Sequence, residues 1–281
     1  MLSYRHAFHA GNHADVLKHL VEIALLRYLN LKDKPYTYID THAGAGIYAL
    51  DAEYARKNRE YETGIAELWQ QHELPPLVAD YVALVRELNP DNELTIYPGS
   101  PWLADAISRN QDKLWLVELH PSDSEILQEN FLDYHRRIHI TIEDGFQALK
   151  ALLPPHTRRG FVLMDPPYEH KSDYENVISA LDESLKRFAT GIFAVWYPLL
   201  SRRESQKLPD QLKALNIKSW LHVSMQIKKP AEDGMGMFGS GMFVINPPWT
   251  LHDTLKETLP WLTDVLAEDD TANYTLEQHT R

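Results

Sequence analysis

The sequence contains no cysteine in its 281 residues. Disulfide bridges and thiolate metal sites are therefore excluded, and the absence is compatible with a reducing cytoplasm. The sequence also lacks any apolar run near the roughly 18 residues that suggest a transmembrane helix. Its N-terminal stretch carries histidines and charges where a signal peptide would have an apolar segment. We therefore expect a cytoplasmic protein with no membrane partner.

Basic residues are the minority charge, with 28 Lys and Arg against 40 Asp and Glu and a formal net charge of −12. This balance disfavours a general nucleic-acid coat, because binding to phosphates depends on neutralisation by Lys and Arg. Basic pairs such as Arg158-Arg159 are scattered along the chain, and each pair alone is typical of a solvated surface. Any nucleic-acid partner must therefore be bound by a local feature.

Seven short runs rich in β-branched and aromatic residues indicate strands, and helical patterns separate most of them. They occupy residues 36–40, 114–119, 138–143, 161–165, 192–197, 220–227 and 242–247. Helices between successive strands predict a mostly parallel sheet. Only a glycine-rich stretch separates the last two runs, which predicts an antiparallel hairpin. The fold class that follows is a doubly wound α/β sheet of seven strands with one reversed strand.

The first and second predicted strands lie about 70 residues apart, whereas one crossover helix should need about 20 to 30. Two helical patterns broken by Pro75-Pro76 fill the excess. We therefore predict a small helical insertion subdomain over residues 52–95. After it, Ser100 and Pro101 have the sequence signature of a helix start.

The rest of the chain divides into a main domain and a tail. Residues 1–51 and 96–270 form the predicted main domain, on either side of the insertion. The last stretch of the chain, residues 263–281, is acidic and poorly periodic, and we expect residues 271–281 to form a loosely held tail.

A short glycine turn follows the first predicted strand in "DTHAGAGIYAL", where Gly44 and Gly46 flank one alanine. Small residues there let the backbone pass close to a ligand. The third glycine of the G-x-G-x-x-G dinucleotide fingerprint is replaced by alanine. The second strand ends at Glu118, where doubly wound proteins place an acid for ribose hydroxyls, and Asp144 and Gly145 follow the third.

These residues should surround one ligand, because the carboxyl ends of parallel strands meet at the same edge of a sheet. A dinucleotide would need a pyrophosphate cradle at a helix N-terminus. S-adenosyl-L-methionine has no phosphate and offers a sulfonium, an ammonium and a carboxylate. Acids around a short glycine turn suit it better, and we expect it as the cofactor.

The fourth predicted strand runs directly into Asp165, Pro166, Pro167 and Tyr168. The two prolines fix the backbone and have no N–H, so nearby carbonyl groups remain free to accept hydrogen bonds. Asp165 adds a carboxylate acceptor, and Tyr168 adds a ring of the kind that stacks on a nucleobase taken out of its helix. Together they predict a pocket that binds an exocyclic amine for methylation, without specifying the base.

Several longer strings resemble one family. The glycine turn followed by "DPPY" resembles adenine amino-methyltransferases in general. The strings "LSYRHAFHAGNHADVLKH", "YIDTHAGAG", "YPGSP", "ELHPSD", "DPPYE", "ATGIFAVWYP" and "INPPW" resemble the RlmJ-type large-subunit ribosomal RNA adenine methyltransferases. The resemblance spans nearly the whole chain and leaves out only the tail.

The resemblance implies a Rossmann-like class I methyltransferase with a helical insertion. It further implies a cytoplasmic enzyme that methylates the exocyclic N6 of one adenosine in 23S ribosomal RNA, in protein-free or early precursor form. The methyl donor would be S-adenosyl-L-methionine, and we expect a monomer.

The resemblance also implies roles for residues by position. The cofactor contacts would be His19, His42, Ser100, Glu118, Asp144 and Gly145, with Gly44 and Asp165 beside them. Asp165 would be the catalytic acceptor of the amine, together with Pro166 and Tyr168. The substrate side would be lined by Tyr4, His6, Lys18 and Tyr168.

Four histidines fall near the N-terminus, namely His6, His9, His13 and His19. No cysteine or paired carboxylate completes a tetrahedral set, so we expect no metal site. A surface segment rich in His, Tyr, Arg and Lys suits stacking on bases and contact with phosphates, and an ordinary capping helix is the alternative. "HADVLKHLVEIALLRYL" predicts an amphipathic helix with Lys18 near its start and an inward face formed by Val16, Leu20, Ile23 and Leu26.

Two other features have more than one interpretation. Trp196 either fills the core of the fifth strand or forms the wall beside the target base. The string "INPPW" at residues 245–249 imitates the amine-acceptor motif, but it lies on the predicted seventh strand, away from the cofactor edge, and is interpreted as a structural turn.

Three alternative functions remain open at this point. A guanine amino-methyltransferase of ribosomal RNA would use a similar motif. A non-catalytic nucleic-acid-binding protein, including one involved in the use of external DNA, would retain the pocket without turnover. A nicotinamide dehydrogenase would bind a dinucleotide at the same edge.

Overall fold

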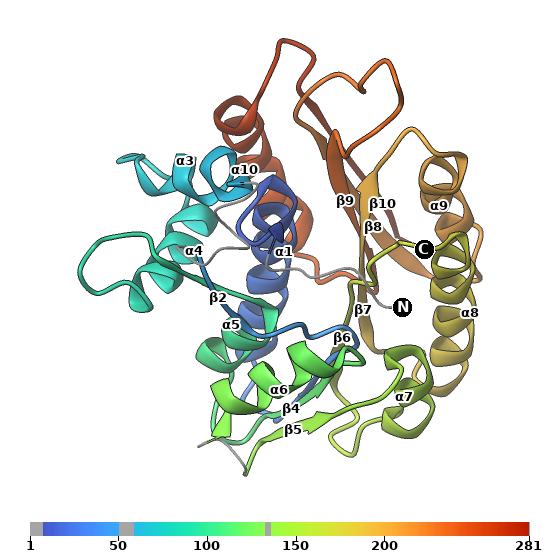
Figure 1. Ribbon diagram of the computed structural model, residues 1–281. Coiled ribbons are helices and arrows are strands. Elements are labelled where there is room, and N and C mark those ends of the chain that lie inside the picture. Colours follow the sequence, from blue (N-terminus) through green and yellow to red (C-terminus); the bar gives the residue numbers. More distant parts are fainter. Residues whose placement is uncertain (1–7, 51–58, 133–135, 281) are drawn as a thin grey trace.

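The computed structural model describes residues 8–50, 59–132 and 136–280. Within them an eight-stranded sheet lies between two layers of helices (Figure 1). In order across the sheet the strands are β10 (Asn273–Thr280), β8 (Ser219–Gln226), β9 (Gly239–Ile245), β7 (Ile192–Leu199), β6 (Gly160–Met164), β1 (Thr37–Asp40), β4 (Lys113–Val117) and β5 (Ile138–Thr141). None of the described helices has the length and apolarity needed to cross a membrane.

The five neighbouring strands from β7 to β5 pair in parallel. Their sequences explain this arrangement, because β6 is buried at every residue, as expected for a parallel strand covered on both faces. The strand order reverses between β1 and β6, and Asp165 follows β6 directly at that point. Ligands of doubly wound sheets bind at the carboxyl edge beside such a reversal.

Strand β9 is antiparallel to both of its neighbours, β7 and β8. The predicted hairpin between the last two runs is therefore confirmed. The seven strands from β8 to β5 also confirm the predicted Rossmann-like sheet with one reversed strand.

Different helices cover the two faces of the sheet (Figure 1). The first face carries α1 (His13–Asn30), α5 (Ser100–Ile107), α6 (Pro121–Asn130) and α10 (Leu251–Leu266). The second carries α7 (Gly145–Leu152), α8 (Lys171–Arg187) and α9 (Arg203–Lys213). Helix α5 begins with Ser100 and Pro101, as the sequence predicted.

The predicted insertion is helical in its described part, which begins at residue 59. It contains η2 (Glu60–Thr63), α3 (Ile65–Trp69) and α4 (Pro76–Glu87), and a small hairpin of β2 (Ile47–Ala49) and β3 (Ile96–Pro98) closes its base. Buried side chains such as Ile65, Val78 and Tyr81 belong to the same apolar core as α1. The insertion therefore extends the main core.

Helix α1 is buried on nearly all sides. The predicted inward residues Val16, Leu20, Ile23 and Leu26 are fully buried. The prediction of an amphipathic surface helix was nevertheless wrong, because Asp15, Lys18, His19 and Glu22 are buried as well. The reason is tertiary: α4, α5 and α10 pack around α1 and cover the face that its sequence would leave to solvent.

The predicted loose tail was also wrong, because residues 273–280 form β10. This strand pairs with β8 over its whole length, from Asn273 opposite Gln226 to Thr280 opposite Ser219. Most of its side chains are exposed, so the sequence shows no apolar alternation. The strand is held by backbone pairing and by an ion pair from Lys213 to Glu277.

We predict that a chain ending at Ala272 is less stable than the full chain. The truncation removes the partner of β8 and leaves the backbone groups of that edge unpaired, and net contributions of about 1 kcal/mol per hydrogen bond should sum to several kcal/mol at most. Thermal and urea unfolding would measure the loss, and light scattering would report self-association through the open edge. Unchanged unfolding curves would mean that residues 273–280 do not stabilise the fold.

Candidate active site

A cavity of about 180 Å³ opens at the carboxyl edge of the sheet. It brings together predicted cofactor residues that follow β1, β4, β5 and β6 or begin α5, namely His42, Gly44, Ser100, Glu118, Asp144, Gly145 and Asp165. Six acidic side chains line it, Glu118, Asp123, Asp144, Asp165, Glu169 and Asp173, against one cation, Lys18. The cavity therefore favours a cationic ligand over a pyrophosphate.

The glycine turn is held by the acid at the end of β4. Gly44 donates its N–H to Oε2 of Glu118 at 2.7 Å, and His120 donates its N–H to Oε1 at 2.6 Å. Gly44 has a φ of +60°, and a Cβ there would lie 2.3 Å from the hydroxyl of Tyr48. The position therefore requires glycine. Burial raises the pKa of Glu118, although both N–H groups act in the opposite direction.

A buried polar chain supports the floor of the cavity. Ser100 donates its hydroxyl to Oδ2 of Asp40 at 2.6 Å, and the Tyr38 hydroxyl lies 3.0 Å from the same oxygen and 2.8 Å from Oε1 of Glu22. Burial, and next the neighbouring Asp40, raise the pKa of Glu22 well above its usual value. Since Tyr38 has one proton to donate, a protonated Glu22 would leave that proton for Asp40.

His42 and the start of α7 form one wall of the cavity. Burial lowers the pKa of His42 to about 4, so the imidazole is neutral at pH 7. Its ring packs edge-on against Phe146, with centroids 5.0 Å apart. Asp144 caps α7 by accepting the N–H groups of Phe146 and Gln147. A Cβ on Gly145 would lie 1.9 Å from the carbonyl oxygen of Thr41, so this helix start can approach β1 closely only with glycine.

A second cavity of about 250 Å³ adjoins the first. Four residues line both cavities, namely Lys18, Asp165, Pro167 and Glu169. The rest of the second cavity is formed by residues from the start of α1, from β7 and from the loops after β6, β7 and β8, including Tyr168, Trp196, Arg202 and Met237. Asp165 therefore stands where two cavities meet.

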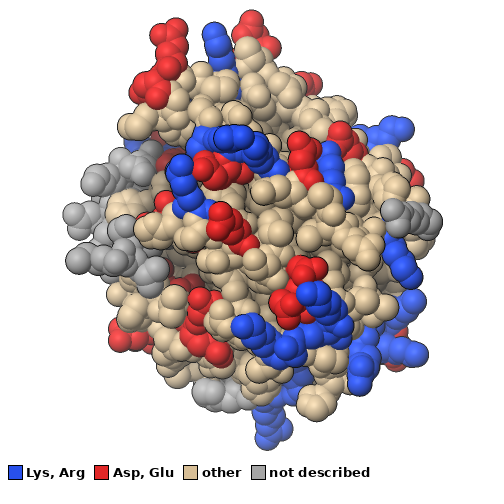
Figure 2. Space-filling model, turned by 90° about the vertical axis from the view of Figure 1, so that its right-hand side faces the viewer, with Lys and Arg blue, Asp and Glu red and all other residues tan. Residues whose placement is uncertain are grey.

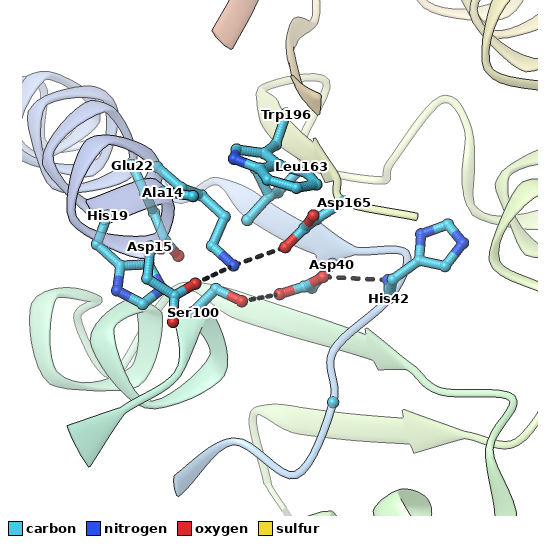
Figure 3. Close-up of polar contacts among 12 residues, drawn as sticks. Ala14, Asp15, His19, Glu22, Asp40, His42, Ser100, Leu163, Asp165 and Trp196 are labelled. Atoms are coloured by element: carbon cyan, nitrogen blue, oxygen red, sulfur yellow. Dashed lines mark hydrogen bonds and ion pairs between the residues drawn. The ribbon is translucent and has the colours of Figure 1, made fainter. Parts of the chain in front are cut away.

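Asp165 is held by an ion pair with α1. The Nζ atom of Lys18 lies 2.6 Å from Oδ2 of Asp165 and 2.9 Å from Oδ1 of Asp15 (Figure 3). Burial alone would lower the pKa of Lys18, but Asp15 and Asp165 raise it well above its usual value. Lys18 is therefore a fixed cation, and within the described residues Oδ1 of Asp165 has no hydrogen-bond or ion-pair partner.

Tyr168 is built into the wall of the second cavity. Its side chain is almost fully buried, and its hydroxyl donates to the carbonyl oxygen of Trp196 at 2.7 Å. Its φ of +50° is strained for a non-glycine residue, at a cost on the order of 1–3 kcal/mol. Arg202 donates to its carbonyl oxygen at 3.2 Å. These contacts hold the ring in place beside Asp165.

Trp196 lies on the second cavity, which supports the interpretation of this residue as a wall. Figure 3 shows its indole above Leu163 and beside Asp165. Sequence reasoning missed Asp15, Arg202 and Met237. Asp15 could have been found from its spacing of three residues from Lys18, which puts both on one helix face. Arg202 and Met237 reach the cavity through loops that carry no motif.

Not every predicted site residue lies on a cavity. Tyr4 and His6 lie outside the described residues. His19 is fully buried and lines neither cavity, which does not support the predicted direct cofactor contact. Its Nδ1 lies 2.8 Å from the Tyr97 hydroxyl, and the two rings stack. His19 therefore supports the packing behind the wall.

The other histidines of this stretch do not gather around a common point. His13 is buried, and His9 lies on the second cavity with its Nδ1 2.9 Å from Oε1 of Glu60. Across the described ranges there is no cluster of three or more His, Asp or Glu side chains that could hold a metal ion.

Comparison with known proteins gives a consistent result. A family model described as "Ribosomal RNA large subunit methyltransferase D, RlmJ" matches residues 33–280. Two relatives named "Ribosomal RNA large subunit methyltransferase J" are each 48% identical to this chain. The match to the Haemophilus influenzae protein covers 99% of this chain and 98% of the relative, and the match to the Escherichia coli protein covers 98% of each.

A solved structure has the same fold. The crystal structure of a protein from Legionella pneumophila superposes with a TM-score of 0.89 at 34% identity, and the match covers 97% of this chain and 99% of that one. The family match extends through β10, so the expectation that the C-terminal tail lies outside the resemblance was wrong.

We predict that Glu22→Gln gains stability relative to the wild type as the pH rises from 5 to 8. The raised pKa means that folded wild-type protein binds a proton that the unfolded chain has lost above about pH 4.5, so wild-type stability falls with rising pH. The glutamine amide does not titrate, so its variant lacks this pH dependence. Each unit of pKa difference between the folded and unfolded states changes the free energy of unfolding by about 1.4 kcal/mol. Urea unfolding of both proteins at both pH values measures the effect. A stability difference that stays constant with pH would contradict a protonated Glu22.

Proposed function

We propose, since the chain belongs to the RlmJ family of ribosomal RNA large subunit methyltransferases, that it methylates the exocyclic N6 of an adenosine in 23S ribosomal RNA. The methyl donor is S-adenosyl-L-methionine. The observation that carries the proposal is the position of Asp165 at the junction of two cavities. One cavity has the charge and the acids for the donor, and the other has aromatic walls for a base.

The first cavity fits S-adenosyl-L-methionine on three counts. Its excess of acids suits the sulfonium and ammonium charges of the cofactor. Glu118 stands at the strand end where an acid accepts ribose hydroxyls. Gly44 lines the cavity and has no Cβ, so its backbone can approach a ligand closely. When bound, the cofactor supplies an electrophilic methyl group.

The chain's contribution to the transfer is mainly positioning. The amino group of adenine is a poor nucleophile because its lone pair is delocalised into the ring. Oδ1 of Asp165 and the carbonyl oxygens of the proline turn can accept its two hydrogens, which favours a pyramidal nitrogen with a localised lone pair. Lys18 fixes the Asp165 carboxylate through its Oδ2 atom. The carboxylate can therefore direct the bound amine toward the first cavity, where the cofactor would lie.

The second cavity fits a base that has left its helix. The rings of Tyr168 and Trp196 stand 6.0 Å apart at 52°, and both line the cavity. Trp196 is only partly buried and can stack on an unstacked base, whereas Tyr168 is almost fully buried and supports the wall. Because the Tyr168 hydroxyl and carbonyl are both anchored, the ring is already in place before a base arrives. The backbone strain at Tyr168 is consistent with such a preformed wall.

The proposal includes the form of the substrate and the setting of the enzyme. The RNA is protein-free or an early precursor, and the enzyme acts in the cytoplasm as a monomer. An unpaired adenosine of accessible RNA could enter the second cavity, whereas a base stacked within a duplex could not.

We predict that Asp165→Ala lowers methyl transfer to 23S ribosomal RNA by about 10³-fold or more, while the Kd for S-adenosyl-L-methionine changes less than about threefold. Loss of one preorganised group that acts on the transition state typically costs 10²–10³ in rate. Transfer of a tritiated methyl group measures the first quantity, and calorimetric titration measures the second. Asp165→Asn, which keeps one acceptor oxygen, should be less impaired. Turnover of the alanine variant within tenfold of the wild type would contradict the role of Asp165.

We further predict that the product is N6-methyladenosine. Nucleoside analysis of 23S ribosomal RNA methylated by the purified protein separates it from N2-methylguanosine by mass and retention. The control is RNA that is already methylated, which should accept no further methyl group. A methylated guanine would overturn the assignment of the base while leaving the amine-acceptor geometry intact.

A further inference from the structure

The string "INPPW" lies at the edge of the sheet opposite the candidate active site, because β9 runs in the reverse direction. The expectation that it stands away from the cofactor edge is confirmed. Asn246 has a φ of +54° and donates its side-chain amide to the carbonyl oxygens of Ala189 and Gly191, at 2.9 and 2.7 Å. Two prolines follow it, and the turn ends at Trp249, whose side chain is 79% exposed. A rigid turn therefore presents an indole ring to solvent.

A hollow of about 1000 Å³ lies beside this turn. Its lining includes Trp249 together with the basic residues Lys32, Lys34, Arg158 and Arg159. Arg159 is bonded to the carbonyl oxygens of Leu29 and Lys34 and shapes the wall. Lys32, Lys34 and Arg158 are exposed. Among the described residues, their side chains have no hydrogen-bond or ion-pair partner.

The charge at this hollow is opposite in sign to that of the whole chain. Three unpaired cations face solvent there, and the lining acid is Asp33, whose nearest cation is Arg109 at 3.8 Å. The chain as a whole carries −12. Several cations outside the hollow are held in ion pairs, among them Arg27 with Asp80 and Lys228 with Glu268. On the face that carries α8 and α9, Figure 2 shows Lys and Arg mixed with Asp and Glu, and ion pairs such as Lys186 with Asp182 lie there.

We propose that this hollow binds a second segment of the RNA substrate. Lys32, Lys34 and Arg158 would contact phosphates, and Trp249 would stack on an unpaired base. Unpaired cations around an exposed aromatic ring are the features of single-stranded nucleic-acid binding. The inference rests on the proposed function, because it requires that the substrate is RNA. The inference also extends the proposed function. The length of β6 separates the cavity edge of the sheet from the hollow by about 16 Å, so an RNA that reaches both must be longer than the bases around the target.

The test compares two RNAs. One is unmodified, in vitro transcribed 23S ribosomal RNA, and the other is a short oligoribonucleotide with only the target adenosine and its immediate neighbours. We expect Trp249→Ala to raise the Kd for the long transcript about tenfold, since a stacked base is worth a factor of that order. The Kd for the short oligonucleotide and the kcat on it should not change. Trp249→Phe, which keeps an aromatic face, should retain most of the affinity.

A triple variant, Lys32→Ala with Lys34→Ala and Arg158→Ala, tests the phosphate contacts. It should reduce the slope of log affinity for the long transcript against log salt by about 2, since each single-strand phosphate contact contributes about 0.7. The matched control removes three exposed lysines outside the hollow, by Lys150→Ala, Lys207→Ala and Lys256→Ala, and should change the slope less. Melting temperatures equal to that of the wild type would confirm that all variants are folded.

The outcomes separate this inference from the proposed function. If the wild type methylates 23S ribosomal RNA but both hollow variants bind the long transcript as tightly as the wild type, the hollow is not an RNA site. If the same variants instead lose affinity for anionic phospholipid vesicles, the hollow is a membrane-binding surface and the RNA inference is wrong. If the wild type fails to methylate RNA, the proposed function fails regardless of the variants.

Discussion

The ammonium of Lys18, buried between two carboxylates, is the interaction on which the site depends. Removing one partner of such a buried pair typically costs about 3–5 kcal/mol, because the other charge is left uncompensated. The pair also fixes geometry, since it joins α1 to the end of β6, 147 positions further along the chain. The position of Asp165 is therefore set by a helix that precedes the first strand of the sheet.

This interaction explains why the first face of the sheet carries more helix than a simple crossover would. Lys18 is buried because α1 is covered on the side away from the sheet. Helix α4 of the insertion and helix α10 pack against α1 on that side. The same packing buries Glu22, and this burial raises the pKa of its carboxyl group. The insertion is thus part of the packing behind the candidate active site.

The sequence was sufficient to predict the parts that depend on local pattern. The apolar runs predicted the strands of the sheet. The residues at the strand ends predicted that Glu118, Asp144 and Asp165 lie together, because parallel strands end at one edge of the sheet. It failed where tertiary contacts decide. The exposed strand β10 is held by pairing that leaves no alternation in its own residues, and helix α1 is covered by α4, α5 and α10 on the face that its sequence would leave to solvent. Neither contact has a local signature.

Strand direction decides what the two similar turns of this chain can do. After β6 and after β9 an acidic or amide residue is followed by two prolines and an aromatic ring, and each turn contains a left-handed residue, Tyr168 in the first and Asn246 in the second. The turn after the parallel strand β6 lies where the two cavities meet, and Tyr168 is buried there with its hydroxyl bonded to the carbonyl oxygen of Trp196. The turn after the reversed strand β9 lies beside the basic hollow, where Trp249 is exposed. The same local sequence pattern therefore places a buried ring at one edge of the sheet and an exposed ring at the other.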